Sequence, residues 1–468
     1  MALIEQLVSI VGETRVRHHP LDLAVFAKDS GIVTGKVVAA VLPGSTEEVA
    51  ACVKAAREHG VPIVPRGAGT GLAGGAVPIE PGLLIVLTRL NEIHEVDEIG
   101  RTAWVGPGLI NLDLSVQLAD RGLHFAPDPS SQQASTIGGN VGTNAGGPHC
   151  LADGTTVAHV LAAEFVTADG DVVMVGGDLP DMPGLDLRAV VVGSEGTLGI
   201  VTKVLVRLMQ NPPDVATILM GFRSIEDAAT TVSEVIASGF VPAALEMLDQ
   251  AMVIAVENFV HAGYPTDAAA VLLAEVTGTS ETVEDAVSTV RSVAETNGAF
   301  VIKVATDDEE RALLWKGRKN AFGAVAQTAP DYYLHDTVVP RTKLVEVMTA
   351  IYEIGAKHDV SMLNVFHAGD GNLHPLVAFD AEEPGKLANV KAAANEMVRV
   401  SIEAGGSLSG EHGVGVEKRD LMGLVFGELD LDAQARVREA FDPDGVMNPG
   451  KILPAGSRCF DAAGVRLT

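Results

Sequence analysis

Two histidines and a glutamate have the types and spacing of a metal-binding site. His367 ends the apolar run NVFH, His374 begins the run HPLV, and the turn AGDGN lies between them. A six-residue loop, Ala368 to Leu373, would place both imidazoles opposite each other on one face of a hairpin, whereas a five-residue loop would separate them. With Glu411 in GSLSGEHG they would offer two nitrogens and a carboxylate, a set that suits Zn²⁺ or Mn²⁺. Two hydrogen-bonded structural histidines give the same spacing, and the spacing alone favours them.

A first glycine-rich segment, PRGAGTGLAGG at residues 65–75, follows the apolar run VPIV and could present consecutive backbone N–H groups to an anion. It contains a formal G-x-G-x-x-G at residues 69–74, the pattern of Rossmann dinucleotide-binding folds. That fingerprint needs glycines that open a helix, but Gly75 and Pro78 interrupt any helix here. The segment therefore predicts phosphate binding outside a Rossmann fold, with a turn that binds nothing as the alternative.

Two further glycine-rich segments, residues 126–148 and 193–200, have the same character. The first is longer and more polar than an ordinary connection, and such loops usually carry function. Small hydroxyl and amide side chains between its glycines would let the backbone approach a large ligand while satisfying the ligand's polar atoms. Three such loops predict one long ligand that contains a pyrophosphate.

Several motifs, in one order along the chain, resemble those of a known enzyme family: PRGAGTGLAGG, DPSSQQASTIGGNVGTNAGG, GSEGTLGI, HAGDGNLHP, GEHGVGVEK and NPGK. The chain resembles the FAD-linked 2-hydroxy-acid dehydrogenases of the vanillyl-alcohol-oxidase superfamily, the group that includes the glycolate oxidase flavin subunit and D-lactate dehydrogenases. The resemblance extends from about Lys36 to Pro454. It implies an α+β protein with a two-part FAD-binding domain, an antiparallel-sheet substrate (cap) domain and a C-terminal segment that returns to the flavin.

The resemblance also implies which residues bind FAD. A covalent flavin bond is not expected, because the first glycine-rich segment contains no His or Cys. The expected cofactor-binding residues, around the pyrophosphate and the flavin, are Arg66, Gly67, Ala68, Gly69, Thr70, Asp128, Thr136, Gly139, Asn140, Thr143, Glu195 and Ile200.

By the same resemblance, the histidine and glutamate set becomes a metal site rather than a structural pair. His412 follows Glu411, so it would lie beside a metal held there, and a neutral imidazole is the usual group that removes a hydroxyl proton. Arg318 matches the arginine that the family uses for the substrate carboxylate, which its forked guanidinium suits better than a lysine would. We expect a hydride to pass from the substrate Cα to flavin N5 while His412 takes the proton. Tyr332, Tyr333 and His335 are expected beside the pocket.

Three apolar residues bear on the substrate. Relatives that accept 2-hydroxyglutarate have polar residues where this chain has Phe322, Leu334 and Leu376. A second substrate carboxylate would be buried there without a partner, at a large desolvation cost. The sequence therefore favours a small monocarboxylate such as glycolate or D-lactate.

Local patterns indicate the elements that would position these residues. Ser45–His59 reads as a helix capped by Ser45 with acidic residues in its first turn, and Asp169-Gly170 between two apolar runs marks a hairpin. Helices are also predicted over 224–238, 281–297 and 342–358. We expect an N-terminal segment 1–35, an FAD-binding domain 36–210, a cap domain 211–420 beginning at the Pro212-Pro213 break, and a returning segment 421–468.

Composition excludes several classes of function. The 33 basic and 61 acidic residues give 33 − 61 = −28, a charge that repels nucleic acid. No stretch approaches the ~20 apolar residues of a membrane-spanning helix, and the start of the chain lacks a secretory pattern. Cys52, Cys150 and Cys459 are too dispersed for a disulfide framework or an iron–sulfur site. We expect a cytoplasmic protein, free or peripherally attached to a membrane, that forms an oligomer.

The electron acceptor and the functional class stay open at this point. Electrons could leave to oxygen, a quinone, a cytochrome or an iron–sulfur partner subunit. A flavin-binding assembly subunit without chemistry would have no need of the histidine, glutamate and arginine set. A metallohydrolase would leave the three glycine-rich segments unexplained.

Overall fold

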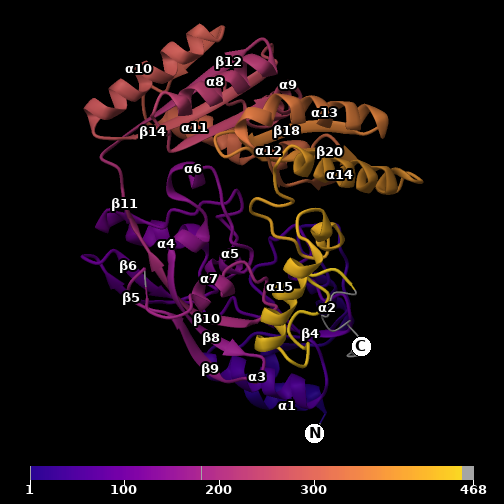
Figure 1. Ribbon diagram of the computed structural model, residues 1–468. Coiled ribbons are helices and arrows are strands. Elements are labelled where there is room, and N and C mark those ends of the chain that lie inside the picture. Colours follow the sequence, from indigo (N-terminus) through magenta and orange to yellow (C-terminus); the bar gives the residue numbers. More distant parts are fainter. Residues whose placement is uncertain (1, 181, 456–468) are drawn as a thin grey trace. The chain divides into compact units, whose positions relative to one another are not determined.

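The computed structural model describes residues 2–180 and 182–455, and within these ranges the chain folds into two compact units (Figure 1). Of the described residues, the first unit contains those up to Gly146, those between Thr155 and Asn211, and residues 411–455. The second unit contains Gly147–Gly154 and Pro212–Gly410.

The chain returns to the first unit at Glu411, earlier than residue 421, where we expected the returning segment to begin. The reason is local. The buried carboxylate of Glu195 accepts hydrogen bonds from the backbone N–H groups of Val414, at 2.6 Å, and Gly415, at 2.8 Å. These bonds attach the segment to the first unit well before residue 421.

Residues 147–154 also differ from expectation, because they belong to the second unit and not to the domain that surrounds them in the sequence. They include the short helix α6 (Cys150–Asp153). His149 lies 3.0 Å from the carboxylate of Glu275, within the second unit. Cys52 is a buried free thiol, and Cys459 lies outside the described residues.

The first unit contains a small mixed sheet with the strand order β1-β2-β4-β3. Its strands are β1 (Val16–Arg17), β2 (Val37–Val41), β4 (Gly82–Val86) and β3 (Ile63–Arg66). β2, β4 and β3 are parallel, and helix α3 (Thr46–Glu58) connects β2 to β3. Ser45 accepts the backbone N–H of Glu48, which confirms the predicted helix cap. Helix α1 (Leu3–Val11) packs against α3, and helix α2 (Pro20–Phe26) follows β1.

A second, antiparallel sheet of the first unit has the order β5-β6-β10-β8-β9. Its strands are β5 (Ile93–Asp97), β6 (Thr102–Val105), β10 (Gly199–Arg207), β8 (Val160–Thr167) and β9 (Val172–Gly176). The predicted hairpin at Asp169-Gly170 joins β8 to β9, and Gly170 has the positive φ of +77° that favours glycine there. The other elements are helices α4 (Asn111–Leu118), α5 (Ile137–Thr143), α7 (Leu187–Val191) and α15 (Glu428–Phe441), and the strand pair β7 (Leu123–His124) and β11 (Met209–Gln210).

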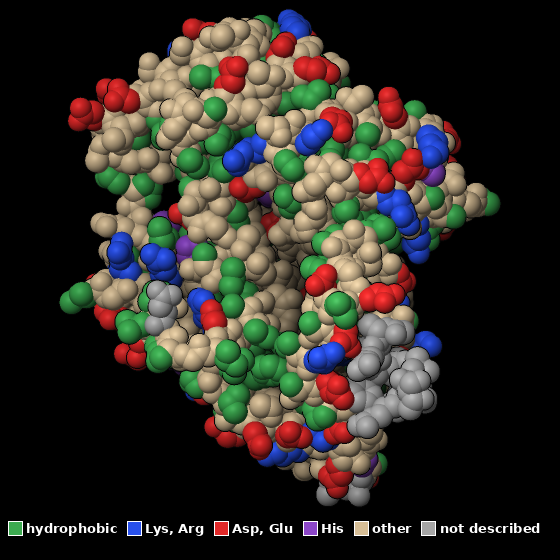
Figure 2. Space-filling model, in the orientation of Figure 1, with side chains coloured by type: hydrophobic (Ala, Val, Ile, Leu, Met, Phe, Trp, Pro, Cys, Tyr) green, Lys and Arg blue, Asp and Glu red, His purple; other side chains and the backbone are tan. Residues whose placement is uncertain are grey.

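The edge strand β9 exposes apolar side chains. Figure 2 shows hydrophobic side chains gathered over this strand, where Val172 and Met174 are 48% and 55% exposed. Buried residues of β6, β8 and β10 form an apolar core with α4 and α5.

The second unit is built on one antiparallel sheet with the order β15-β12-β14-β13-β18-β19-β17, in which β20 also pairs with β18 and β16. Its strands are β12 (Asp214–Phe222), β13 (Ala244–Asp249), β14 (Ala270–Gly278), β15 (Val301–Val304), β16 (Asp331–Leu334), β17 (Thr337–Val338), β18 (Ser361–His367), β19 (Asn372–Leu373) and β20 (Pro375–Phe379). Its longer helices are α8 (Ile225–Ala237), α9 (Gln250–Val260), α10 (Ser280–Thr296), α11 (Asp308–Lys319), α13 (Leu344–Lys357) and α14 (Lys386–Glu403), and the short helix α12 (Ala321–Val325) follows α11.

Helices α8, α10 and α13 confirm the three helices predicted for this part of the chain. In the described ranges, none of the helices combines the length and the apolar character needed to cross a membrane. The architecture is the expected α+β class, with an antiparallel sheet in the second unit.

Candidate active site

The first two glycine-rich segments meet in the first unit where β3 ends. A Cβ atom at Gly67 would lie 2.4 Å from the hydroxyl oxygen of Thr136, a distance that real side chains do not show. Thr136 in turn caps α5 by accepting the backbone N–H of Gly139 at 3.2 Å. Gly69 and Gly74 have φ values of +79° and +77°. The loop thus approaches α5 with bare backbone, which fits the close approach that a pyrophosphate requires.

The guanidinium of Arg66 lies against Gly69 of this loop, where a Cβ atom would be 2.1 Å from Nη2, but its hydrogen bonds go to backbone carbonyl oxygens. Its buried guanidinium donates to the carbonyl oxygen of Lys28 at 2.8 Å and to that of Ala76 at 3.3 Å. These bonds use the side chain to hold the N-terminal segment against the loop. Backbone N–H groups of Gly67–Thr70 are therefore better candidates for phosphate ligands than the Arg66 side chain.

Asn111 ties the second glycine-rich segment together, a role that the sequence did not reveal. Its side-chain amide donates to the carbonyl of Pro127, at 2.8 Å, and to the side-chain oxygen of Asn140, at 3.2 Å. Asp128 follows Pro127 and is 8% exposed. One buried amide thus links Asn140 to Pro127, the residue before Asp128, and both Asn140 and Asp128 are expected near the flavin. Thr143 lies one turn further along α5 and donates to the carbonyl of Gly139 at 3.4 Å.

The side chains of Glu195 and Ile200 both contact other parts of the first unit. The Ile200 side chain is 1% exposed and lies in the apolar core of the first unit, so only its backbone could line a ligand. Burial raises the pKa of Glu195, against the backbone N–H groups of Gly415 and Val414 that lower it. The side chain of Asn448 donates to the carbonyl oxygen of Glu195 at 2.6 Å. Glu195 therefore joins the third glycine-rich segment to the C-terminal segment of the first unit.

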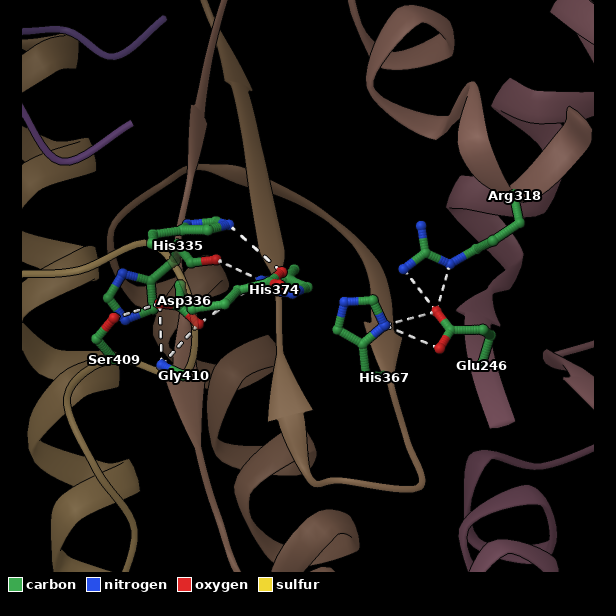
Figure 3. Close-up of polar contacts among 10 residues, drawn as sticks. Glu246, Arg318, His335, Asp336, His367, His374, Ser409 and Gly410 are labelled. Carbon is green, nitrogen blue, oxygen red and sulfur yellow. Dashed lines mark hydrogen bonds and ion pairs between the residues drawn. The ribbon is translucent and has the colours of Figure 1, made fainter. Parts of the chain in front are cut away.

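The second unit contains a buried polar cluster on β13 and β18 (Figure 3). The register places Glu246 directly opposite His367, and both side chains are almost fully buried. Nδ1 of His367 lies 2.8 and 2.9 Å from the two carboxylate oxygens of Glu246. Arg318, near the end of α11, donates to Oε2 of Glu246 from Nε at 2.7 Å, and its Nη2 lies 2.6 Å from the same oxygen. One carboxylate thus contacts both side chains.

Electrostatics keep Glu246 ionised despite its position. Burial alone would raise its pKa, but the charges of Arg318 and His367 and the hydrogen bonds from both outweigh burial and lower the pKa below its usual value. Arg318 is 1% exposed, and its Nη1 has no hydrogen-bond partner among the described residues. A buried guanidinium nitrogen in that state is suited to receive an anionic ligand.

His374 lies beside His367, but not in the register that we considered. His367 pairs with Asn372, so the loop between the paired residues has only four residues, 368–371. His374 is two residues beyond Asn372 and therefore on the same face of the strand. The two imidazole rings are 5.1 Å apart and edge to face. The hairpin brings the pair together by a diagonal contact, where we had considered a direct one.

Both imidazoles fit the requirements of metal ligands. Nδ1 of His374 lies 3.3 Å from the carbonyl oxygen of His335, and Nδ1 of His367 faces the Glu246 carboxylate. Because a carbonyl and an ionised carboxylate only accept hydrogen bonds, each ring carries a proton on Nδ1, and in its neutral form it keeps the lone pair on Nε2. Such acceptors behind the ring are typical of histidines that bind metals.

Asp336 holds the segment that leads to Glu411 and His412, the remaining residues of the predicted site. It is fully buried and accepts hydrogen bonds from the hydroxyl of Ser409, at 2.6 Å, and the backbone N–H of Gly410, at 3.0 Å (Figure 3). Glu411 is the next residue along the chain, and in the first unit its carboxylate lies 3.8 Å from Nε2 of His412.

Glu246 and Asp336 were missed by sequence reasoning. Glu246 lies between the apolar residues Leu245 and Met247 in AALEMLD, and Asp336 lies in the otherwise largely apolar segment DYYLHDTVV, so an acidic residue in a strand-like segment was the available signal. A buried carboxylate requires a partner, so both positions could have been singled out.

The apolar residues expected to restrict the substrate lie in the second unit. Leu334 on β16 and Leu376 on β20 are register partners and are 6% and 0% exposed. Phe322 lies on α12, which directly follows the helix of Arg318. The ring of Tyr333 stacks on that of His335 at 6.3 Å.

Comparison with known proteins gives consistent results. Residues 37–176 match the family description "FAD binding domain", and residues 211–452 match "FAD linked oxidases, C-terminal domain". The chain is 45% identical to glycolate oxidase subunit GlcD of Escherichia coli over 90% of this chain and 84% of that protein. It is 39% identical to the GlcD subunit of Bacillus subtilis over 97% of both chains, and 34% identical to a D-lactate dehydrogenase of Anaerostipes hadrus over 91% of this chain and 92% of that protein.

Solved structures agree on the fold. p-Cresol methylhydroxylase superposes with a TM-score of 0.81 at 18% identity, covering 97% of this chain and 96% of that one. The 4-ethylphenol oxidase of Gulosibacter chungangensis gives 0.79 at 19% identity, covering 97% of both chains. The matching family models and relatives, together with the glycine-lined backbone of the first unit and the antiparallel sheet of the second, show that the chain is an FAD-linked oxidoreductase and belongs to the FAD-linked oxidases.

Proposed function

We propose that this protein oxidises a small 2-hydroxy acid, glycolate or D-lactate, to the corresponding 2-oxo acid. The observation that carries the proposal is the buried Nη1 of Arg318, which has no hydrogen-bond partner among the described residues. Two buried imidazoles lie in the same unit, and one of them shares the Glu246 carboxylate with Arg318. The names of the relatives, glycolate oxidase subunit and D-lactate dehydrogenase, support the same substrate class.

Each residue has one role in the proposed reaction. Arg318 binds the substrate carboxylate through the edge of the guanidinium that Glu246 does not use. His412 accepts the hydroxyl proton as the Cα hydride leaves, so that one proton and one hydride are removed and a C=O bond forms. Bound FAD supplies the hydride acceptor, N5 of its isoalloxazine ring.

His367 and His374 would hold a divalent metal, Zn²⁺ or Mn²⁺, together with Glu411. The fit rests on the tautomers of the two imidazoles, which the acceptors behind them set. A metal at these ligands would lower the pKa of the substrate hydroxyl. His412 would then need to be only a moderately strong base.

Apolar side chains favour a monocarboxylate. Leu334 and Leu376 are paired and buried, and neither can hydrogen-bond a second carboxylate. A dicarboxylate such as D-2-hydroxyglutarate would leave a charge without a partner, so we expect its oxidation to be much slower.

The route of the electrons is part of the proposal. The three dispersed cysteines of the sequence do not form an iron–sulfur motif, so the reduced flavin must pass electrons to another molecule. The word "subunit" in the relative's name favours a partner subunit as the acceptor, for which we propose an iron–sulfur protein, with a cytochrome, a quinone or oxygen as the other candidates. Non-covalent FAD, an oligomeric assembly and a cytoplasmic location remain predictions.

The visible spectrum of the anaerobic protein tests the proposal. The protein, supplied with FAD and Zn²⁺ or Mn²⁺, is recorded before and after addition of D-lactate, L-lactate, glycolate and D-2-hydroxyglutarate in turn. Bleaching of the flavin band near 450 nm by a monocarboxylate would support the proposal. A yellow protein that none of these acids bleaches would instead favour an assembly subunit or a different alcohol.

A further inference from the structure

The buried carboxylate of Glu246 contacts two side chains that the proposed reaction uses for different purposes. On one side it lies within 2.7 Å of Nε and Nη2 of Arg318, and on the other within 2.9 Å of Nδ1 of His367. All three side chains are at most 3% exposed.

We propose that Glu246 is a positioning residue that orients the metal ligand His367 and the anion-binding Arg318 at the same time. This inference rests on the proposed function, because it assigns Glu246 to the same site. It goes further by predicting that metal affinity and substrate binding depend on one residue that contacts neither ligand itself.

Strand register makes the arrangement rigid on one side. Glu246 and His367 are directly paired residues of β13 and β18, so their Cβ atoms are held close together by the sheet. The carboxylate therefore determines both the direction of the imidazole and which nitrogen carries the proton. With Nδ1 protonated, Nε2 is the nitrogen that can bind a metal.

On the other side, Glu246 selects the free edge of Arg318. The guanidinium uses Nε and Nη2 for the carboxylate, and these two nitrogens form one edge of the fork. Nη1 is thereby kept away from Glu246 and remains available to a ligand carboxylate. Without Glu246, the guanidinium could rotate and would keep a buried charge without its partner.

Substitution by glutamine tests the proposal sharply. In Glu246→Gln the amide oxygen at the Oε2 position can still accept from Arg318 and from Nδ1 of His367, but the amide NH₂ that replaces Oε1 sets a donor against the same Nδ1–H. The preference for a proton on Nδ1 is therefore weakened. We expect the affinity of the flavin-loaded protein for Zn²⁺ alone, measured by competition with a chromogenic chelator, to fall by about 10–100-fold. With saturating Zn²⁺, KM for D-lactate or glycolate should also rise.

Glu275→Gln is the matched control. Glu275 is a buried carboxylate on the neighbouring strand β14 and also contacts a histidine, His149, but it contacts neither Arg318 nor His367. This variant should keep the Zn²⁺ affinity of the unmodified protein. Equal losses in the two variants would show a general effect of removing a buried charge and would overturn the proposal.

A double-mutant cycle covers the case in which Glu246→Gln does not fold. Glu246→Asp keeps the negative charge but is one methylene too short to reach both partners, so it should also weaken Zn²⁺ binding. In a His367→Gln background the same change should have no further effect, because the residue acts through His367. An effect of Glu246→Asp that persists in that background, or wild-type Zn²⁺ affinity in folded Glu246 variants, would refute the inference. Failure of the unmodified protein to bind Zn²⁺ or oxidise a 2-hydroxy acid would instead refute the proposed function.

Discussion

Gly67 passes so close to Thr136 that a single added methyl group would lie 2.4 Å from the threonine hydroxyl oxygen. The first glycine-rich segment can therefore reach α5 only because residue 67 has no side chain. The same hydroxyl caps α5, so a displacement of Thr136 would also disturb the start of that helix. The hydroxyl oxygen of Thr136 therefore both limits the space at residue 67 and caps α5.

Gly67→Ala should accordingly reduce FAD affinity. Overpacking of this kind costs roughly 1–3 kcal/mol, which corresponds to about 10–100-fold weaker binding if the strain is relieved by moving the loop. Flavin retained through gel filtration, read at about 450 nm, measures the effect. Gly423→Ala serves as the control, because a Cβ atom there would meet nothing within 4 Å. Full flavin retention in Gly67→Ala would show that this approach does not matter for the cofactor.

Asn448 should matter for stability more than its position near the end of the described chain suggests. Its side chain donates to the carbonyl oxygens of Gly75, at 2.8 Å, and Glu195, at 2.6 Å, and its φ is +41°. Asn448→Ala loses both hydrogen bonds and adds strain at the positive φ, so the free energy of unfolding should fall by roughly 2–4 kcal/mol. Urea denaturation measures it. Asn448→Gly should relieve the backbone strain without restoring the two hydrogen bonds, so it should be more stable than Asn448→Ala. Equal stability of the two variants would exclude a contribution from the positive φ.

The pKa of Glu195 predicts a pH dependence of stability. Burial raises this pKa above its ordinary value of 4.5, so the folded chain binds the proton more tightly than the unfolded chain. The contribution of Glu195 to stability is therefore greatest at acidic pH and declines as the pH rises from about 4.5 through the folded-state pKa. Denaturant unfolding across pH 4 to 8 should show this decline in the unmodified protein relative to Glu195→Gln. A difference between the two proteins that does not change with pH would contradict the raised pKa.

Sequence reasoning identified most elements because their signals are local. The cap at Ser45 and the turn at Asp169-Gly170 depend on residues within a few positions of each other, and the structure confirms both. The boundary at Glu411 was misplaced for the opposite reason, because it depends on Glu195, more than two hundred residues away in the sequence. No local pattern indicates which loop will accept a backbone N–H group.

The candidate site shows the same division. His367 and His374 could be singled out from their spacing, although the hairpin reaches their contact through a pairing with Asn372 that the spacing did not indicate. Glu246 could not be assigned a partner, since the register of β13 against β18 decides which residue it faces. Candidate ligands and bases can be identified in a sequence by residue type. The residues that orient them can be identified only once the strand pairing is known.

Arg318→Lys tests the binding of the substrate carboxylate. Lysine retains the charge but offers no second edge once it pairs with Glu246, so the substrate loses a charge-assisted hydrogen bond worth roughly 1.5–3 kcal/mol. We expect kcat/KM for the preferred acid to fall by about 10–100-fold, mostly through KM. Arg223→Lys is the control, because Arg223 is an exposed residue that pairs with Asp267. An unchanged KM in Arg318→Lys would remove Arg318 from the substrate site.

His412→Ala should separate proton removal from binding. If His412 is the base, its loss should slow flavin reduction in stopped-flow experiments by about 10²–10⁴-fold, with little change in substrate affinity. Because proton removal then limits the rate, the effect of solvent D₂O on flavin reduction should also increase. His94→Ala is the control, because His94 is an exposed histidine on β5 of the first unit. It should leave both the rate of flavin reduction and its solvent D₂O effect unchanged. If His412→Ala reduces the flavin at the normal rate, the base must be another group. The neighbouring Glu411 would then be the next residue to replace. Metal content should be measured in parallel, because Glu411 is also a proposed metal ligand.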